Sequence, residues 1–163
     1  MGNNMMKRLA TTGAFLLSSL ISFNLAAAAA EQTPEQLAAA SVGQRQAVFK
    51  LLAFSNGALG AMARGAPFNA EVAIRGTERV AMLASLIPEV FANNTTGVAG
   101  LTTRASDTIW ANQADFNQMA QDLADGAAQA LEILNTQGEA GVRDAVAAIG
   151  PKCGACHDRF RTE

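Results

Sequence analysis

The chain has 163 residues, half of them hydrophobic and 16% charged, with a formal net charge of −2. This length suits one domain with a buried core, and the composition indicates no second one. Because the chain has no basic surplus to neutralise phosphates, we do not expect a nucleic-acid partner.

The first 30 residues have the pattern of a secretory signal peptide. Lys7 and Arg8 precede an apolar stretch over 13–25, and an alanine tract ends at Ala30. This order of basic, apolar and small residues is typical of a cleaved export signal. A retained membrane anchor is the alternative, but the apolar stretch is short for a bilayer. We expect an exported chain that starts at Glu31, has a net charge of −4 without the two basic residues, and does not bind membranes.

The remainder, 31–163, is predicted to be one all-α domain. Apolar residues recur at spacings of three and four, alanine is abundant, and period-two runs are absent. Helices are expected over about 34–63, 70–87 and 113–134, with a last helix after 138. Short links between long helices favour antiparallel neighbours, so the predicted architecture is an up-down four-helix bundle.

Several residues predict where these helices begin and end. Thr33 and Gln36 have the spacing of a capping box, and Asn69 is the expected cap of the second helix. Pro88 is expected to end or kink the second helix. The Gly-Pro pair at 150–151 is expected to kink the last helix or to make it restart.

The apolar spacing also predicts which face of each helix is buried. The first helix is expected to bury Leu37, Ala40, Val48, Leu51, Leu52, Leu59 and Met62. The second is expected to bury Val72, Gly76, Val80, Leu83 and Ile87. The third is expected to bury Phe116, Ala120, Leu123, Ala127, Ala130 and Leu134, and the last Val142, Val146, Ile149, Cys153, Cys156 and Phe160.

Both cysteines and the single histidine lie within five positions, as Cys153, Cys156 and His157. This C-x-x-C-H pattern is the attachment motif of c-type haem. On a helix, positions i, i+3 and i+4 share one face, so two thiols can form thioethers with the porphyrin while the imidazole reaches the iron. We predict one covalent haem c per chain, with His157 as an axial ligand of the iron. Since bacterial haem attachment takes place outside the cytoplasm, the expected location is the periplasm.

Other chemistries use similar motifs and remain open at this point. A thioredoxin-like thiol pair belongs at a strand-to-helix turn, and no strand pattern is visible. A structural zinc site usually needs four thiolate or imidazole ligands, and this chain offers three. A disulfide across one helical turn is strained.

A second axial ligand has to come from elsewhere in the chain, because only six residues follow His157 and there is no other histidine. Methionine is the usual partner of histidine in electron-transfer cytochromes. Met62, Met82 and Met119 remain after the signal segment, and the common role of methionine is to fill the core.

Taken together, these residues resemble the class II cytochromes c, the family of cytochromes c′ and c-556. The resemblance covers nearly all of 31–163. It rests on "CGACHDRFR" at 153–161, "RQAVFK" at 45–50, "LIPEVF" at 86–91 and "TIW" at 108–110. It implies a four-helix bundle with the haem motif in the last helix.

By this resemblance, the residue at position 49 separates two subtypes of the family. In c-556-like members this position is a methionine that ligates iron, whereas here it is Phe49. A phenyl ring has no lone pair, so the resemblance implies a five-coordinate, high-spin haem with Phe49 on its distal side. Met62 lies thirteen positions later, on a different side of the same helix, and should not replace the missing ligand. Phe49 can also be a plain core residue, and both roles can hold.

The resemblance implies three further residues beside the haem. Arg45, four positions before Phe49, could pair with a haem propionate or be solvated. Arg161, four positions after His157, could reach the proximal side or offset the helix dipole. Trp110 is placed near the haem by the resemblance and is otherwise a core anchor.

The implied function is the binding of small neutral gases, nitric oxide and carbon monoxide, with electron transfer to redox partner proteins as a second role. The resemblance also implies a homodimer formed through the first two helices. We do not expect an enzyme. The first alternative is a low-spin electron carrier of the c-556 type, and the second is a helical interaction or metal-storage protein in which the motif is accidental.

Overall fold

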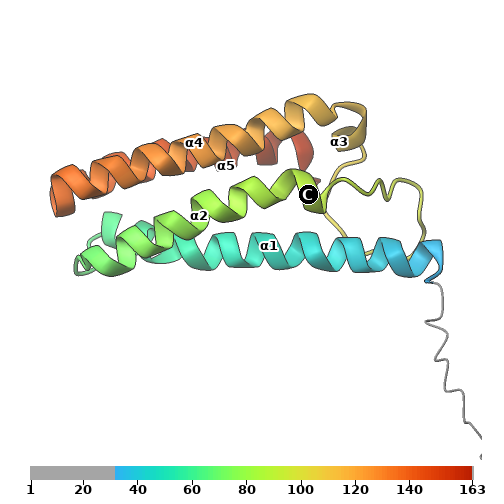
Figure 1. Ribbon diagram of the computed structural model, residues 1–163, viewed down its shortest axis with the longest axis horizontal. Helices are drawn as coiled ribbons and strands as arrows, with labels where there is room; N and C mark the ends of the chain where they lie inside the picture. The colour runs from blue at the N-terminus through green and yellow to red at the C-terminus, as the bar shows by residue number, and fades with distance from the viewer. Residues whose placement is uncertain (1–31, 163) are drawn as a thin grey trace, which may run out of the picture. The chain divides into compact units, whose positions relative to one another are not determined.

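A computed structural model describes residues 32–162 as an arrangement of helices (Figure 1). The long helices are α1 (Pro34–Ala63), α2 (Ala70–Val90), α4 (Gln113–Gln137) and α5 (Val142–Phe160). A short helix α3 (Thr108–Ala111) precedes α4, and a 3-10 turn η1 (Gly138–Gly141) follows it. The predicted all-α four-helix bundle is confirmed, and the described residues contain no strand beyond one isolated bridge. The predicted signal peptide, 1–30, lies outside the described residues.

The start of α1 follows the predicted capping box. The Thr33 hydroxyl accepts a hydrogen bond from the Gln36 backbone N–H at 3.3 Å, and the Gln36 side chain accepts one from the Thr33 N–H at 2.9 Å. Pro34 occupies the first helical position, where its missing N–H costs nothing. These contacts satisfy donors that the first turn leaves free.

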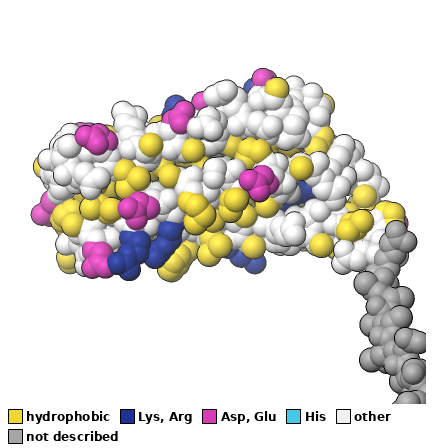
Figure 2. Space-filling view, in the orientation of Figure 1, with side chains coloured by type: hydrophobic (Ala, Val, Ile, Leu, Met, Phe, Trp, Pro, Cys, Tyr) yellow, Lys and Arg dark blue, Asp and Glu magenta, His cyan; other side chains and the backbone are white. Residues whose placement is uncertain are grey.

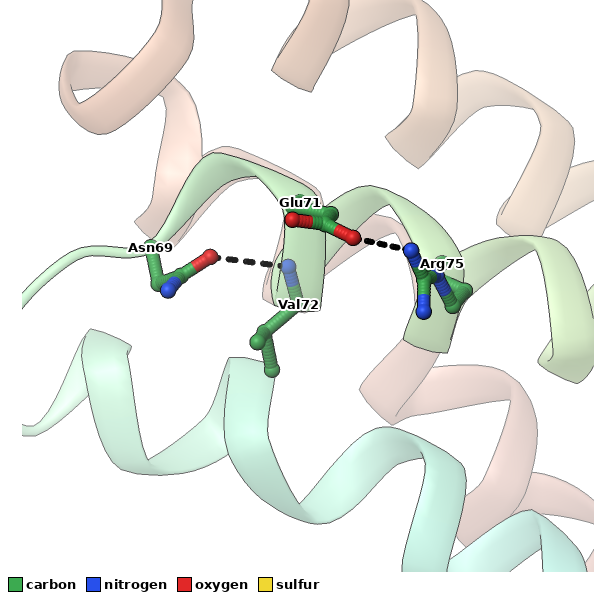
Figure 3. Close-up of polar contacts among 4 residues, drawn as sticks. All are labelled: Asn69, Glu71, Val72 and Arg75. Carbon is green, nitrogen blue, oxygen red and sulfur yellow. Dashed lines mark hydrogen bonds and ion pairs between the residues drawn. The ribbon is translucent and has the colours of Figure 1, made fainter.

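The start of α2 is also capped as expected (Figure 3). The Asn69 side-chain oxygen accepts a hydrogen bond from the Val72 N–H at 3.0 Å. One turn further on, Glu71 and Arg75 form an ion pair. Both side chains of this pair are exposed, so the ion pair stabilises the helix by only a few tenths of a kcal/mol. The Asn69 cap therefore contributes more to the start of α2.

Neither proline ends its helix. The helix α2 continues past Pro88 to Val90, so the expected stop at position 88 is wrong. Buried Ile87 and Phe91 anchor the chain on both sides of this proline. The helix α5 is continuous through Pro151, and the expected restart is not seen. An internal proline removes one helical hydrogen bond, a loss that packing on either side can outweigh.

The long helices pack in the order α1, α2, α4, α5, and each contacts the next, while α1 and α5 contact each other far less. Figure 1 shows α2 between α1 and α4. The predicted stripe of α4 is buried throughout, from Phe116 to Leu134. Because α1 and α5 stand apart, their facing sides are free to line a cavity.

Four residues that the spacing predicted to be buried are exposed, and one of them is the small Ala40 on α1. The other three are large: Leu37 and Leu51 on α1 and Val72 on α2 each leave more than two fifths of their surface free. Apolar residues surround much of α1, so spacing by itself could not show which side packs on α2. Figure 2 shows hydrophobic side chains on the outer surface where α1 and α2 lie.

Candidate haem site

A cavity of about 810 Å³ lies among α1, α2, α4 and α5. This volume falls in the range of roughly 300–1,000 Å³ that is typical of small-molecule sites. Its wall is largely apolar, with side chains from the four long helices, from α3 and from the segment before α3. The large apolar residues of the wall are Phe49, Leu52, Val80, Ile87, Phe91, Ile109, Phe116, Met119, Leu123, Ile149 and Phe160.

The three residues of the C-x-x-C-H motif all line this cavity from α5. Cys153, Cys156 and His157 are half-buried and come to one side because they lie three and four positions apart on a helix. Both cysteines are free, so the disulfide alternative is not realised. Between residues 32 and 162 no three His, Cys, Asp or Glu side chains gather as a metal site, which leaves the zinc alternative without its ligands there.

The thiols are in a neutral state that does not suit a redox-active pair. Burial raises the pKa of Cys153, and burial together with the neighbouring Cys153 raises the pKa of Cys156. Reactive thiol pairs instead have a lowered pKa, because the thiolate is the nucleophile. The structure therefore disfavours the thioredoxin-like alternative.

The His157 imidazole is held in its neutral form. Burial lowers its pKa most, the positive charges of Arg161 and Arg104 lower it further, and the Asp158 carboxylate acts in the opposite direction. A neutral imidazole has a ring nitrogen with a free lone pair, which is the form that binds a metal. The chemistry of this donor set therefore fits a haem iron.

Aromatic rings connect the α1 side of the cavity with α5. Phe49 on α1 meets Phe91 edge to face, with ring centroids 6.2 Å apart. Phe91 packs on Phe116 at 4.7 Å, and Phe116 packs on Phe160 at 5.3 Å. Because Phe49 is half-buried and lines the cavity, its ring is held by packing and still borders the open space.

Trp110 is not among the residues that line the cavity. Its ring packs on Phe91 at 6.4 Å, and its indole N–H donates a hydrogen bond to the Phe91 carbonyl at 3.0 Å. The structure therefore places it one layer behind the wall, which agrees with the core-anchor alternative.

Arg45 is almost fully buried, so the solvated alternative is wrong. Its guanidinium donates hydrogen bonds to the Val90 carbonyl at 3.0 Å, to the Thr95 hydroxyl at 2.9 Å and to the Asn93 carbonyl. It also lies 4.7 Å from the centre of the Phe91 ring. These contacts hold the end of α2 and the following loop. The side chain borders the cavity as well, so pairing with a haem carboxylate stays a prediction.

Arg161 lies on the cavity wall beside the C-terminal end of α5. Its backbone N–H donates to the His157 carbonyl at 3.1 Å, and it forms the isolated bridge with Ala105. Its positive charge acts on the His157 pKa, so it is close to the imidazole that the sequence associates with it.

Sequence reasoning missed Asn56, a polar residue of the wall. Asn56 lines the cavity, and its buried side-chain oxygen has no hydrogen-bond partner among the described residues. Its position seven residues after Phe49 puts both on one helical face, and this spacing could have identified it. Of the three methionines that the sequence offered as a second ligand, Met119 lines the cavity, whereas Met62 and Met82 do not.

The cavity has the size for a porphyrin, and one wall carries two free thiols and a neutral imidazole. These features fit a covalent haem and define the protein as a c-type haem protein built on a four-helix bundle. No helix among the described residues is long and apolar enough to cross a membrane.

Comparisons with known proteins give the family. The family model for Cytochrome C′ matches residues 40–161. Cytochrome c′ of Rubrivivax gelatinosus is 33% identical over 126 residues, covering 74% of this chain and 93% of the relative. Cytochrome c-556 of Agrobacterium tumefaciens is 33% identical over 118 residues, covering 72% and 90%.

A solved structure also matches, the nitric oxide complex of a mutant cytochrome c prime from Alcaligenes xylosoxidans. Its TM-score is 0.64 at 27% identity, over 76% of this chain and 94% of that one. The chain therefore belongs to the cytochrome c′ family and binds haem c covalently.

Proposed function

We propose that the protein is a periplasmic cytochrome with a five-coordinate, high-spin haem that binds nitric oxide and carbon monoxide and transfers electrons. The observation that carries this proposal is Phe49, which borders the cavity from α1 and cannot donate a lone pair. Family membership does not choose the subtype, because the relatives include both cytochrome c′ and cytochrome c-556.

The α5 side of the cavity would hold the cofactor. Cys153 and Cys156 would carry the two thioether bonds, and the neutral imidazole of His157 would bind the iron. The haem supplies a redox-active iron that takes a diatomic ligand on its free side.

The α1 side would control which ligands reach the haem. Phe49, Leu52 and Ala53 present only hydrocarbon to the cavity. A wall of this kind disfavours charged ligands, which would lose their hydration, and the packed Phe49 ring limits ligand size. Nitric oxide and carbon monoxide are small and neutral. The solved relative in its nitric oxide complex supports nitric oxide as the first ligand to test.

The low-spin alternative is favoured by one observation, the position of Met119 on the cavity wall. Its thioether is the methionine sulfur to examine as a sixth ligand. This alternative predicts that Met119→Leu converts a low-spin spectrum into a high-spin one.

The deciding experiment is the absorption spectrum of the purified, reduced protein with and without carbon monoxide. We expect a broad high-spin spectrum that changes on adding carbon monoxide and is the same in Met119→Leu. A sharp low-spin spectrum with no response to carbon monoxide would contradict the proposal. Denaturation in alkaline pyridine measures covalent haem separately, and the absence of a c-type band would exclude both haem functions.

We also infer a homodimer that uses the outer face of α1 and α2. The exposed large hydrophobic residues of the described chain all belong to these two helices. They are Leu37, Leu51, Phe54, Val72 and Met82. An exposed set of this kind on one pair of helices supports an interface between copies.

A further inference from the structure

The basic residues of the protein gather around the cavity. Six of the ten lysines and arginines within 32–162 line it, and none of the twelve aspartates and glutamates of that range does. Arg45 is buried and the other five are exposed. The five form what we call the basic rim: Lys50, Arg64, Arg104, Lys152 and Arg161.

The basic rim surrounds the cavity rather than following one helix. Lys50 lies on α1 and Arg64 directly after it. Arg104 lies in the segment before α3. Lys152 lies on α5 and Arg161 directly after it. The ion pairs of the described chain involve other arginines, so no carboxylate of that part neutralises the rim at contact distance. The charges of the basic rim are therefore available to attract a negatively charged molecule from solution.

A haem in the cavity would neutralise only part of the positive charge of the basic rim. A haem has two propionate carboxylates, fewer than the five rim cations. Apart from Arg45 and the basic rim, the described chain has four basic and twelve acidic residues. Charge is therefore distributed unevenly over the described chain: positive residues gather around the cavity, and the other residues carry a net negative charge.

We propose that the basic rim is the docking surface for an acidic patch on a redox partner protein. This inference rests on the proposed electron-transfer function. Attraction at the rim and repulsion elsewhere would orient an acidic partner with its patch over the cavity, where electron transfer takes place. A nucleic acid fits less well, because the cations surround an opening instead of forming a stripe and the remaining surface is acidic.

The test uses the reduced holoprotein and two small oxidants of opposite charge in stopped flow. Each accepts one electron: hexacyanoferrate(III), an anion, and tris(phenanthroline)cobalt(III), a cation. We expect the rate with hexacyanoferrate(III) to fall as salt is added and the rate with the cobalt complex to rise, although the protein has a net negative charge. The opposite signs would overturn the proposal.

Charge-reversed variants assign the effect to the rim. Lys50→Glu and Lys152→Glu should each slow the hexacyanoferrate(III) reaction severalfold at low salt, on the order of tenfold together. Arg143→Glu is the matched control, since it makes the same charge change at an exposed site on α5 away from the cavity. Equal slowing in the control would mean that net charge decides the rate, and the rim would have no special role.

Two further measurements separate the possible failures. Haem content of every variant, measured in pyridine, shows whether the cofactor is attached, so that loss of the haem function is distinguished from loss of docking. Retarded migration of duplex DNA with the wild type but not with Lys152→Glu would identify a nucleic-acid surface and overturn the proposal.

Discussion

Phe49 is the residue on which the proposed coordination state depends. Its ring is held by Phe91 and borders the cavity from α1. We expect Phe49→Met to place a thioether there and to shift the ferrous spectrum toward six-coordinate low spin, with slower carbon monoxide binding. Absorption and stopped-flow spectroscopy measure both effects. Phe49→Leu is the control, and it should stay high-spin because leucine has no donor atom. An unchanged spin state in Phe49→Met would mean that position 49 does not face the iron.

Asn56 places a buried carboxamide oxygen without a hydrogen-bond partner on the wall of the cavity. A buried oxygen without a hydrogen bond costs about 1–3 kcal/mol. We expect Asn56→Leu, which has nearly the same shape, to raise the free energy of unfolding of the haem-free protein by about 1 kcal/mol in urea titration. Asn56→Asp should lower it, because it adds a charge at the same place. A less stable Asn56→Leu would show that the carboxamide has a partner in solution.

Close contact between α1 and α2 depends on a glycine. A Cβ atom at Gly76 would lie 2.5 Å from the Ser55 backbone oxygen, so no side chain fits without separating the helices. Gly76→Ala should lower the free energy of unfolding by about 1–3 kcal/mol. The matched control is Gly43→Ala on α1, where a Cβ meets no atom within 4 Å. This control should gain about 0.5–1 kcal/mol from helix propensity. Thermal unfolding of the two variants should therefore move in opposite directions.

The loop after α2 is held to α1 by Arg45. Replacing it with methionine keeps much of the volume but leaves the Val90 and Asn93 carbonyls without this donor. We expect Arg45→Met to cost about 2–3 kcal/mol of stability in denaturant unfolding. Gln46→Ala next to it should cost less than about 1 kcal/mol, since it removes one exposed hydrogen bond to the Thr102 carbonyl. Similar losses for both would refute the anchoring role of Arg45.

At the scale of the whole molecule, the outer face of α1 and α2 should decide the oligomeric state. Phe54 leaves 74% of its surface exposed, the largest fraction among the large hydrophobic residues of the described chain. If the proposed homodimer forms, we expect Phe54→Glu to convert it into a monomer in sedimentation velocity runs, because the variant would bury a charge at the interface. Gln129→Glu on the exposed side of α4 adds the same charge elsewhere and should leave the dimer intact. A monomeric wild type would refute the homodimer.

Much of the fold follows from local signals in the sequence. Thr33 and Asn69 cap their helices with contacts between near neighbours, and the α4 stripe repeats at a spacing that only one face can satisfy. The positions of Leu37 and Leu51 could not be predicted in this way, because apolar residues surround α1 and only its packing partner selects the buried side. The predicted end of α2 at Pro88 was wrong for a similar reason, because the burial of neighbouring residues outweighs the hydrogen bond that the proline removes.

The sequence by itself determined the family, the helices and the C-x-x-C-H motif, because the spacing of residues on one helix decides whether two thiols and an imidazole share a face. The tertiary structure decided which other residues line the cavity with this motif. The separation of α1 from α5 opens the cavity, turns Arg45 away from solvent, places Trp110 behind the wall, and brings Asn56 and the basic rim to the cavity. These residues are far apart in the chain, and only helix packing determines which of them meet.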